Sequence, residues 1–416
     1  MSPALEPGYL ALIRRNASFR RLWIGNVVSL FGDWFNTIAL YSLILELTGS
    51  EFALGAVFIT KMLPWALASP VSGVIVDRFN RRRLMIASDL VRAVIVMGFL
   101  LVDDASDVWM LYVLIAMQVV VGSAFHPAQT SSIPNVTSDE ELLTANTIMA
   151  ATWSVLLALG AALGGIAADL LGLKAVFLID SASYLVSALF IFRATIPQRT
   201  HSGSNSGGIL RTAIDEVALG WGHIRANPKI SRIVTAKAAW AVGGGACVYM
   251  LALLGESLAP GRHAAAIGVL FAARGIGTGI GPVLGRRWFL DPVQWPRVLA
   301  VCIIVSGGFY SIVGVMPWSF LIALPVVVAH AASGLNWVFS TVMLQSRTTD
   351  AFRGRVFSTE WVVVMLADTA SILMASLVLE LGLLTLKQAV LAFACLQMVS
   401  GLIWLKTVVP AEAAAR

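Results

Sequence analysis

Charged residues are scarce in this sequence. Asp, Glu, Lys and Arg make up 12% of its 416 residues, whereas they make up about 25% of a soluble domain. Hydrophobic residues account for 58% of the chain. So few charges cannot cover a folded body of this size with a water-facing surface, and we therefore interpret the chain as an integral membrane protein.

Cysteine and histidine are scarce too, with three and five residues. The cysteines, Cys247, Cys302 and Cys395, stand singly in separate apolar runs, which indicates neither a disulfide framework nor a zinc site. The sequence contains no Gly-x-Ser-x-Gly, no His-Glu-x-x-His and no Walker-type phosphate loop. We therefore expect no enzyme, no metal and no cofactor, and the energy for any work must come from a gradient or from the substrate.

Long apolar runs dominate what is present. A run needs about 20 residues to cross roughly 30 Å of hydrocarbon. The basic opening from Arg14 to Arg21 leads into a run that is too long for a signal-peptide core, so we expect this run to be retained as the first span. The twelve runs lie near residues 22–47, 52–76, 84–102, 108–130, 143–168, 174–194, 231–255, 264–285, 298–315, 318–344, 356–380 and 387–409.

A stretch of different composition separates the sixth run from the seventh. Residues 201–208 are rich in Gly and Ser, and residues 213–225 are suited to a short amphipathic helix. The sequence therefore predicts an all-α membrane protein with twelve transmembrane helices in two six-helix bundles. We expect residues 1–195 to form the first bundle, 196–229 the linker and 230–416 the second bundle.

Positive charge is distributed unevenly between the loops. Of the 29 Lys and Arg residues, 22 fall on one side of the predicted spans and three, Lys174, Arg262 and Lys387, on the other. Loops rich in Lys and Arg stay in the cytoplasm, so we expect both termini there and the protein in the inner membrane. The net charge of +6 follows from these loops and indicates no nucleic-acid partner.

The loop after the second run carries the most specific motif. Gly73, Asp77, Arg78, Arg81 and Arg82 stand where an apolar helix must stop. We expect Gly73 to admit a close neighbouring helix and Asn80 to take the left-handed conformation of a tight turn. The spacing resembles the loop between spans 2 and 3 of the major facilitator superfamily, usually Gly-x-x-x-Asp-Arg-x-Gly-Arg-Arg, with Asn80 in place of the usual glycine.

Further segments resemble a narrower group, the bacterial exporters related to enterobactin and macrolide efflux proteins, with the lysophospholipid transporter more distant. These segments are Phe31-Gly32-Asp33-Trp34, residues 47–50, 124–134, Ala145-Asn146, 159–165 and 353–357. The resemblance implies two bundles that rock against each other, with span 2 facing span 11 and span 5 facing span 8. It also implies that spans 1, 4, 7 and 10 line a central cavity.

Four ionisable residues lie near mid-depth in the spans: Asp33, Lys61, Arg274 and Asp368. Each costs about 2.5–3.5 kcal/mol on insertion scales and so needs a partner or a function. By the resemblance Asp33 faces the substrate path, where we expect a proton carrier, an aspartate in a water-filled cavity or a permanent pair with Lys61. Asp368 has two candidate partners, Lys61 in an outer gate or Arg274 within the second bundle.

Two further sets of residues complete the candidate site. The resemblance implies a cytoplasmic gate in which Asp77 meets the start of span 11, near Glu360, and Arg81 meets Asp89. The candidates for the substrate cavity are Trp34, Gln118, His126, Lys237, Trp240 and Trp337.

Few charges and many aromatic residues favour a hydrophobic or amphipathic small substrate. We expect a monomer that exports it by alternating access with proton antiport, with the substrate, protons and the lipid bilayer as partners. Transport of a lysophospholipid or another lipid by the same fold is the alternative.

Overall fold

A computed structural model describes residues 8–197, 208–259 and 263–415. The structure is 91% helical, and those residues contain no strand. Within them, twelve helical segments are long and apolar enough to cross a membrane, which confirms the predicted number. The spans are formed by α2 (Ala17–Thr48), α3 (Glu51–Arg78), α4 (Arg81–Gly98), α5 (Val108–Gly122) with α6 (Phe125–Val136), α7 (Asp139–Leu171), α8 (Leu173–Arg193), α10 (Pro228–Leu258), α11 (His263–Trp288), α12 (Trp295–Val315), α13 (Ala323–Arg347), α14 (Asp350–Glu380) and α15 (Leu386–Ala414).

Short elements complete the described chain. Two further α-helices, α1 (Tyr9–Arg15) and α9 (Ile209–Ala226), are too short or too polar to span a membrane. Four 3₁₀ turns begin or end spans: η1 (Phe99–Leu101), η2 (Ala105–Asp107), η3 (Pro292–Gln294) and η4 (Phe320–Ile322). α9 agrees with the amphipathic helix predicted at 213–225 and is longer at its start. The glycine- and serine-rich residues before it lie largely outside the described residues.

Several helices begin before the apolar run that predicted them. Capping residues explain the extra turns, because they satisfy backbone N–H groups that a helix start leaves free. Asn16 accepts a hydrogen bond from the backbone N–H of Phe19 at 2.9 Å and starts α2. Ser138 and Glu141 form a capping box that starts α7.

The fourth span is interrupted, which the sequence prediction of one run at 108–130 missed. α5 ends at Gly122 and α6 begins at Phe125. Pro127 has no N–H to bond to the carbonyl of Ser123, so an unbroken helix would lose a bond there, whereas the first turn of a new helix tolerates proline. His126 therefore lies in the first turn of α6 rather than capping the inner end of one long helix.

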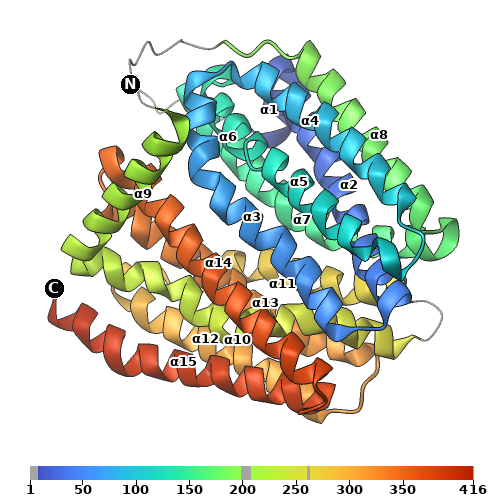
Figure 1. Cartoon of the computed structure of the whole chain (residues 1–416). Coiled ribbons are helices and arrows are strands. Elements are labelled where there is room, and N and C mark those ends of the chain that lie inside the picture. Colours follow the sequence, from blue (N-terminus) through green and yellow to red (C-terminus); the bar gives the residue numbers. More distant parts are fainter. Residues whose placement is uncertain (1–7, 198–207, 260–262, 416) are drawn as a thin grey trace.

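The two halves of the chain form two helical bodies (Figure 1). α7 packs against α11, and α3 packs against α14, across the boundary between them. These are spans 5 and 8 and spans 2 and 11, as the family resemblance implies. Glycines permit the close approach of α7 and α11: a Cβ on Gly275 would lie 2.5 Å from the backbone nitrogen of Ala158.

Both ends of the described chain lie on one side of the molecule (Figure 1). We call this the terminal side; it also holds the turn between α3 and α4, and α9. The amphipathic helix α9 contacts both halves there. Arg78 of α3 donates to Thr212 Oγ1 at 3.3 Å, and Arg355 of α14 pairs with Glu216, with 2.9 Å between Nη2 and Oε1.

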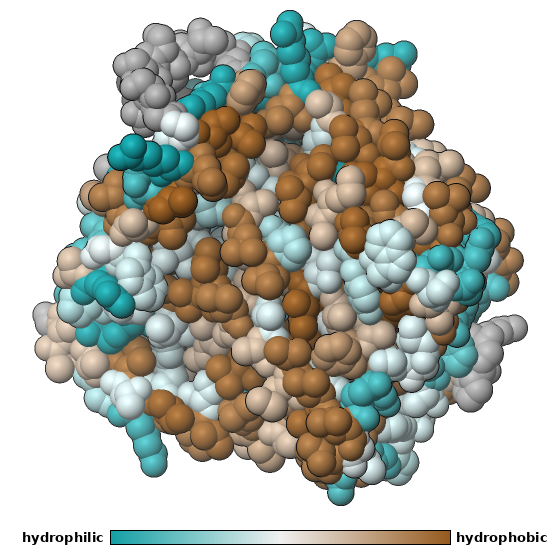
Figure 2. Space-filling model, viewed as in Figure 1, coloured by the Kyte–Doolittle hydropathy of each residue, from teal (hydrophilic) through white to brown (hydrophobic). Residues whose placement is uncertain are grey.

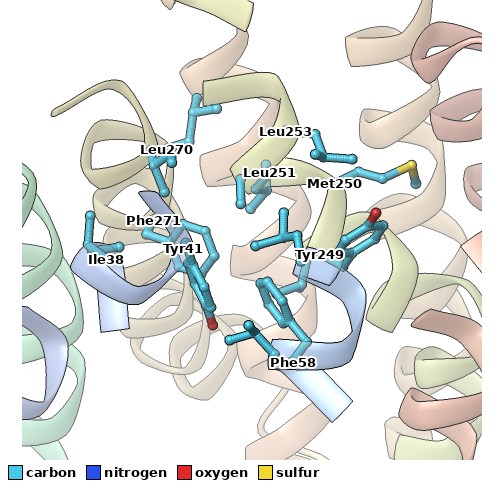
Figure 3. Close-up of a cluster of buried hydrophobic side chains, with 14 of the residues drawn as sticks. Ile38, Tyr41, Phe58, Tyr249, Met250, Leu251, Leu253, Leu270 and Phe271 are labelled. Carbon is cyan, nitrogen blue, oxygen red and sulfur yellow. The ribbon is translucent and has the colours of Figure 1, made fainter. Parts of the chain in front are cut away.

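On the opposite, distal side, aromatic side chains from both halves pack together (Figure 3). Tyr41 of α2 stacks on Phe58 of α3, with ring centroids 4.3 Å apart. Tyr41 also lies 5.6 Å from the ring of Phe271 on α11, and Phe58 lies 5.7 Å from that of Tyr249 on α10. All four rings are buried, so the halves are closed against each other on the distal side.

The outer surface agrees with a membrane environment. Hydrophobic side chains cover much of the middle of the face in Figure 2, and hydrophilic ones gather toward its edges. Exposed apolar residues such as Val91 and Leu185 lie in the middle of the spans that carry them. Lipid, rather than water, is the solvent that suits such a surface.

Candidate functional site

A cavity of about 2450 Å³ lies between the two halves. Its N-terminal wall comes from α3, α6 and α7, and its C-terminal wall comes mainly from α11, α13 and α14. Its lining includes Asp77, Arg78, Arg286 and Arg355, which stand at helix ends on the terminal side. The cavity therefore reaches the terminal side, while the aromatic cluster closes the distal side.

Tryptophans form much of the cavity wall. Trp65 of α3 meets Trp361 of α14 edge to face, with ring centroids 5.0 Å apart, and Trp337 of α13 lies 5.4 Å from Trp361. Trp240 and Trp153 also line the cavity. Large apolar rings of this kind suit the hydrophobic part of a ligand.

Five of the predicted cavity and coupling residues lie on this wall: His126, Arg274, Asp368, Trp240 and Trp337. His126 reaches the cavity because the break before α6 places its ring at the start of a new helix. The structure thus brings these five residues together around one space, although it leaves their roles as predictions.

Trp34 does not line the cavity. Trp34 lies where α2 crosses α7, and a Cβ added to Gly160 would lie 2.8 Å from the Cβ of Trp34. The sequence expectation that Trp34 faces a substrate is therefore not met in this conformation. The close crossing at Gly160 holds its indole between the helices.

Asp33 and Lys61 also lie away from the cavity wall, contrary to the expectation that Asp33 faces the substrate path. Tyr184 of α8 donates a hydrogen bond to Asp33, and Arg92 Nη1 lies 3.9 Å from Asp33 Oδ2. Lys61 Nζ donates to Thr37 Oγ1 at 2.8 Å. Asp33 turns into the first bundle because its partners lie there. Asp33 and Lys61, both among the described residues, do not form the ion pair that was one of the expectations.

A buried polar cluster in the first bundle includes two further predicted residues, Gln118 and Asp89. Gln118 donates to the hydroxyl of Tyr184 at 3.0 Å, so it does not contact the cavity. Asp89 is fully buried and forms an ion pair with Arg92, where the family resemblance had implied Arg81. The guanidinium of Arg81 instead donates to the carbonyl of Ser131 at 2.7 Å.

Sequence reasoning did not single out Asp180, a second buried carboxyl group of this region. Asp180 of α8 is fully buried, and its Oδ2 accepts a hydrogen bond from Asn36 Nδ2 at 2.6 Å. The signal was present, because an aspartate inside an apolar run needs a partner. Asn36 lies one turn beyond Asp33 on α2, so this helix carries both Asp33 and the hydrogen-bond partner of Asp180.

Lys237 and Glu360, predicted for the cavity and the gate, form an ion pair with each other. Lys237 Nζ lies 2.9 Å from Glu360 Oε1, and the side chains are 4% and 1% exposed. The ammonium also lies 4.7 Å from the centroid of the Trp337 ring. The pair joins α10 to α14 behind the cavity wall, and neither residue lines the cavity.

The loop motif on the terminal side departs from expectation at two positions. A Cβ added to Gly73 would have no neighbouring atom within 4 Å, because Gly73 borders the cavity rather than a neighbouring helix. Asn80 has φ −68°, so it is not left-handed. Its side chain caps α4 by accepting from the backbone N–H of Arg83 at 3.0 Å.

The arginines of the motif bind carbonyls at neighbouring helix ends. Arg82 donates through Nε to the carbonyl of Ile191 at 3.3 Å and through Nη2 to that of Phe192. Free carbonyls at a helix C-terminus favour cations. Asp77 lines the mouth of the cavity in this conformation.

Comparison with known proteins identifies relatives of this chain by their sequence and by their fold. The chain is 24% identical over 342 residues to "Putative bacilysin exporter BacE" of Bacillus subtilis strain 168, covering 81% of this chain and 82% of that protein. It is 28% identical to "Uncharacterized MFS-type transporter YfiS" of the same organism over 44% of this chain and 43% of that one. It is 26% identical to "Macrolide efflux protein A" of Streptococcus pyogenes over 43% and 45%. The chain thus spans less than half the length of the last two.

Solved structures share the fold at low sequence identity. A POT family transporter in complex with 5-aminolevulinic acid superposes with TM-score 0.76 and 9% identity, covering 98% of both chains. A bacterial homologue of the human lysosomal transporter Spinster superposes with TM-score 0.68 and 16% identity, covering 95% of both chains. The family model described as Major Facilitator Superfamily matches residues 22–367. This chain therefore belongs to the major facilitator superfamily.

Proposed function

We propose that this protein is a secondary active transporter that exports a hydrophobic or amphipathic small molecule by alternating access, coupled to proton entry. The observation that carries the proposal is the aromatic-walled cavity of about 2450 Å³, which reaches the terminal side while the distal side is closed. A cavity with one open side between two bodies is what one state of an alternating-access cycle requires.

We place the terminal side in the cytoplasm. The excess of Lys and Arg in the loops of that side supports this orientation. The open cavity then faces inward, as uptake of an exported compound from the cytoplasm requires. We further propose a monomer in the cytoplasmic membrane. The exporter names of two relatives, for macrolides and for bacilysin, support the direction of transport.

Two carboxyl groups are the candidates for proton coupling. Asp368 lines the cavity, so a proton and a substrate can compete there. Asp33 lies within the first bundle, with its side chain 35% exposed, and can exchange a proton without meeting the substrate. Carboxyl groups in such settings are the usual sites of proton exchange in transporters.

The test is transport in proteoliposomes with an imposed pH gradient. Wild type, Asp33→Asn and Asp368→Asn are compared for dyes, macrolides and lysolipids, with Asp103→Asn as control because Asp103 lies in an exposed ion pair on the distal side. We expect gradient-driven transport in the wild type and the control, and loss of the coupling in at least one of the other two variants. If transport of every compound ignored the gradient, proton antiport would be abandoned. Movement of lysolipids alone would favour the lipid transporter.

A further inference from the structure

Two opposite charges line the cavity without a partner. Arg274 comes from α11 and Asp368 from α14. Asp368 is 5% exposed, and its Oδ1 and the Nε of Arg274 are buried without a hydrogen-bond partner. Neither side chain forms an ion pair within 4 Å with another described residue. Arg274 instead lies beside the ring of Phe271, 5.8 Å from its centroid.

A buried histidine adds a third unsatisfied group to the same wall. The side chain of His330, on α13, is fully buried, and its Nε2 lies 2.7 Å from the hydroxyl of Tyr310. Its Nδ1 has no partner. His330 packs against α11 three residues from Arg274, since a Cβ on Gly277 would lie 2.9 Å from the Cβ of His330. Three helices of the second half thus each contribute to one wall of the cavity a polar side chain with an unsatisfied buried atom. We call this part of the wall the polar apex.

Such an arrangement is unfavourable in an empty site. A buried charge without a partner costs several kcal/mol, and a buried polar atom without a hydrogen bond costs about 1–3 kcal/mol. The carboxylate of Asp368 packs against α10: a Cβ on Gly245 would lie 2.5 Å from Asp368 Oδ1, so the missing side chain leaves room for it. A ligand that carries both charges would satisfy Arg274 and Asp368 together.

The apolar surroundings define the rest of such a ligand. The ring of Trp240 lies 6.4 Å from that of His330, and Trp337 continues the wall toward the terminal side. A molecule with a dipolar head and an aromatic or aliphatic body would therefore place its head at the polar apex and its body along the tryptophans.

We propose that the polar apex binds the zwitterionic head of an amphipathic substrate, with its ammonium group on Asp368 and its carboxylate on Arg274. This assignment names a substrate class for the transporter proposed above and rests on that function. It predicts that a compound with both charges is preferred to one with either charge alone.

A series of blocked dipeptides tests this preference on the wild-type protein. The probe is phenylalanyl-phenylalanine, compared with its N-acetyl form, its C-terminal amide and the doubly blocked form, by calorimetric titration of the protein in nanodiscs. We expect the free dipeptide to bind about 10- to 100-fold more tightly than either singly blocked form, as loss of one charge-assisted hydrogen bond implies. Equal binding of all four forms, or no binding of any, would overturn the proposal without depending on a variant that folds.

Variants then assign each charge to its partner. Asp368→Asn should weaken binding of the C-terminal amide about 10-fold or more and leave the N-acetyl form unchanged, whereas Arg274→Gln should do the reverse. Asp103→Asn and Lys174→Gln are matched controls, because these two residues form an exposed pair away from the cavity. Equal effects of both cavity variants on both blocked forms would refute the assignment.

Transport and binding are read separately in this design. If the free dipeptide is not preferred while dyes are still exported along a pH gradient, the proposed zwitterion site is refuted and the proposed transport function is kept. If the free dipeptide is preferred and no compound is driven by the gradient, the proposed zwitterion site is kept and proton coupling is refuted.

Discussion

Breaking the ion pair between Lys237 and Glu360 should destabilise the second bundle strongly. The charged atoms are 2.9 Å apart and the side chains are 4% and 1% exposed. At an effective dielectric of about 20, that separation gives an attraction of about 6 kcal/mol, much of it offset by the loss of hydration. Removing one partner leaves the other buried and uncompensated. We therefore expect Lys237→Met and Glu360→Met each to lower the free energy of unfolding by about 3–5 kcal/mol.

The double variant separates this reasoning from a general packing effect. With both charges replaced by apolar side chains of similar length, no buried charge remains, and stability should return to within about 1 kcal/mol of wild type. The free energy of unfolding is measured by titrating mixed micelles with sodium dodecyl sulfate. Lys174→Met, in an exposed pair with Asp103, should change it by less than about 1 kcal/mol. Additive losses in the double variant would refute the argument.

Two further predictions concern contacts that hold the helices together. Gly275→Ala places a Cβ 2.5 Å from the backbone nitrogen of Ala158 and should lower the free energy of unfolding by about 1–3 kcal/mol. Gly308→Ala is the control: its Cβ would meet nothing within 4 Å, so it should be neutral or slightly stabilising. Equal losses of stability for both variants in the same titration would contradict the close crossing of α7 and α11. Arg355→Gln removes the ion pair with Glu216 and should speed amide hydrogen exchange in α9; unchanged exchange would show that the pair does not hold α9 to α14.

The fold could be predicted from the sequence because lipid sets a minimum length for each span. Twelve apolar runs of sufficient length give twelve helices, and arginine-rich loops mark their ends. The helix starts were less accurate, because capping by residues such as Asn16 extends a helix beyond its apolar run. The break at Ser123 was missed because residues 108–130 are together long enough for one span, and only Pro127 marks the place.

The site could be predicted only in part. Arg274, Asp368, Trp240, Trp337 and His126 line the cavity, and their roles stay predictions. The sequence could not show that the other candidate residues turn away from the cavity. A transmembrane helix is apolar toward lipid and also toward its neighbours, so periodicity does not reveal which face meets the cavity.

Partners between distant segments were the hardest to foresee. Asp33 meets Tyr184 from a helix 151 positions along the chain, and Lys237 meets Glu360, which follows it in the chain, in α14. Each residue was recognisable alone as a charge that needs a partner. Only the packing of α2 on α8, and of α10 on α14, selects the partner.

The central claim is that the two halves open alternately to the two sides, and distances between spin labels test it directly. One label pair is placed at Phe79 and Leu290 on the terminal side, and a second at Leu171 and Leu383 on the distal side, all exposed; Cys395, the exposed native cysteine, is replaced first. On acidification, or on addition of a transported compound, we predict that the terminal distances shorten while the distal distances lengthen. Distances that change in the same direction on both sides, or on neither side under any condition, would contradict alternating access.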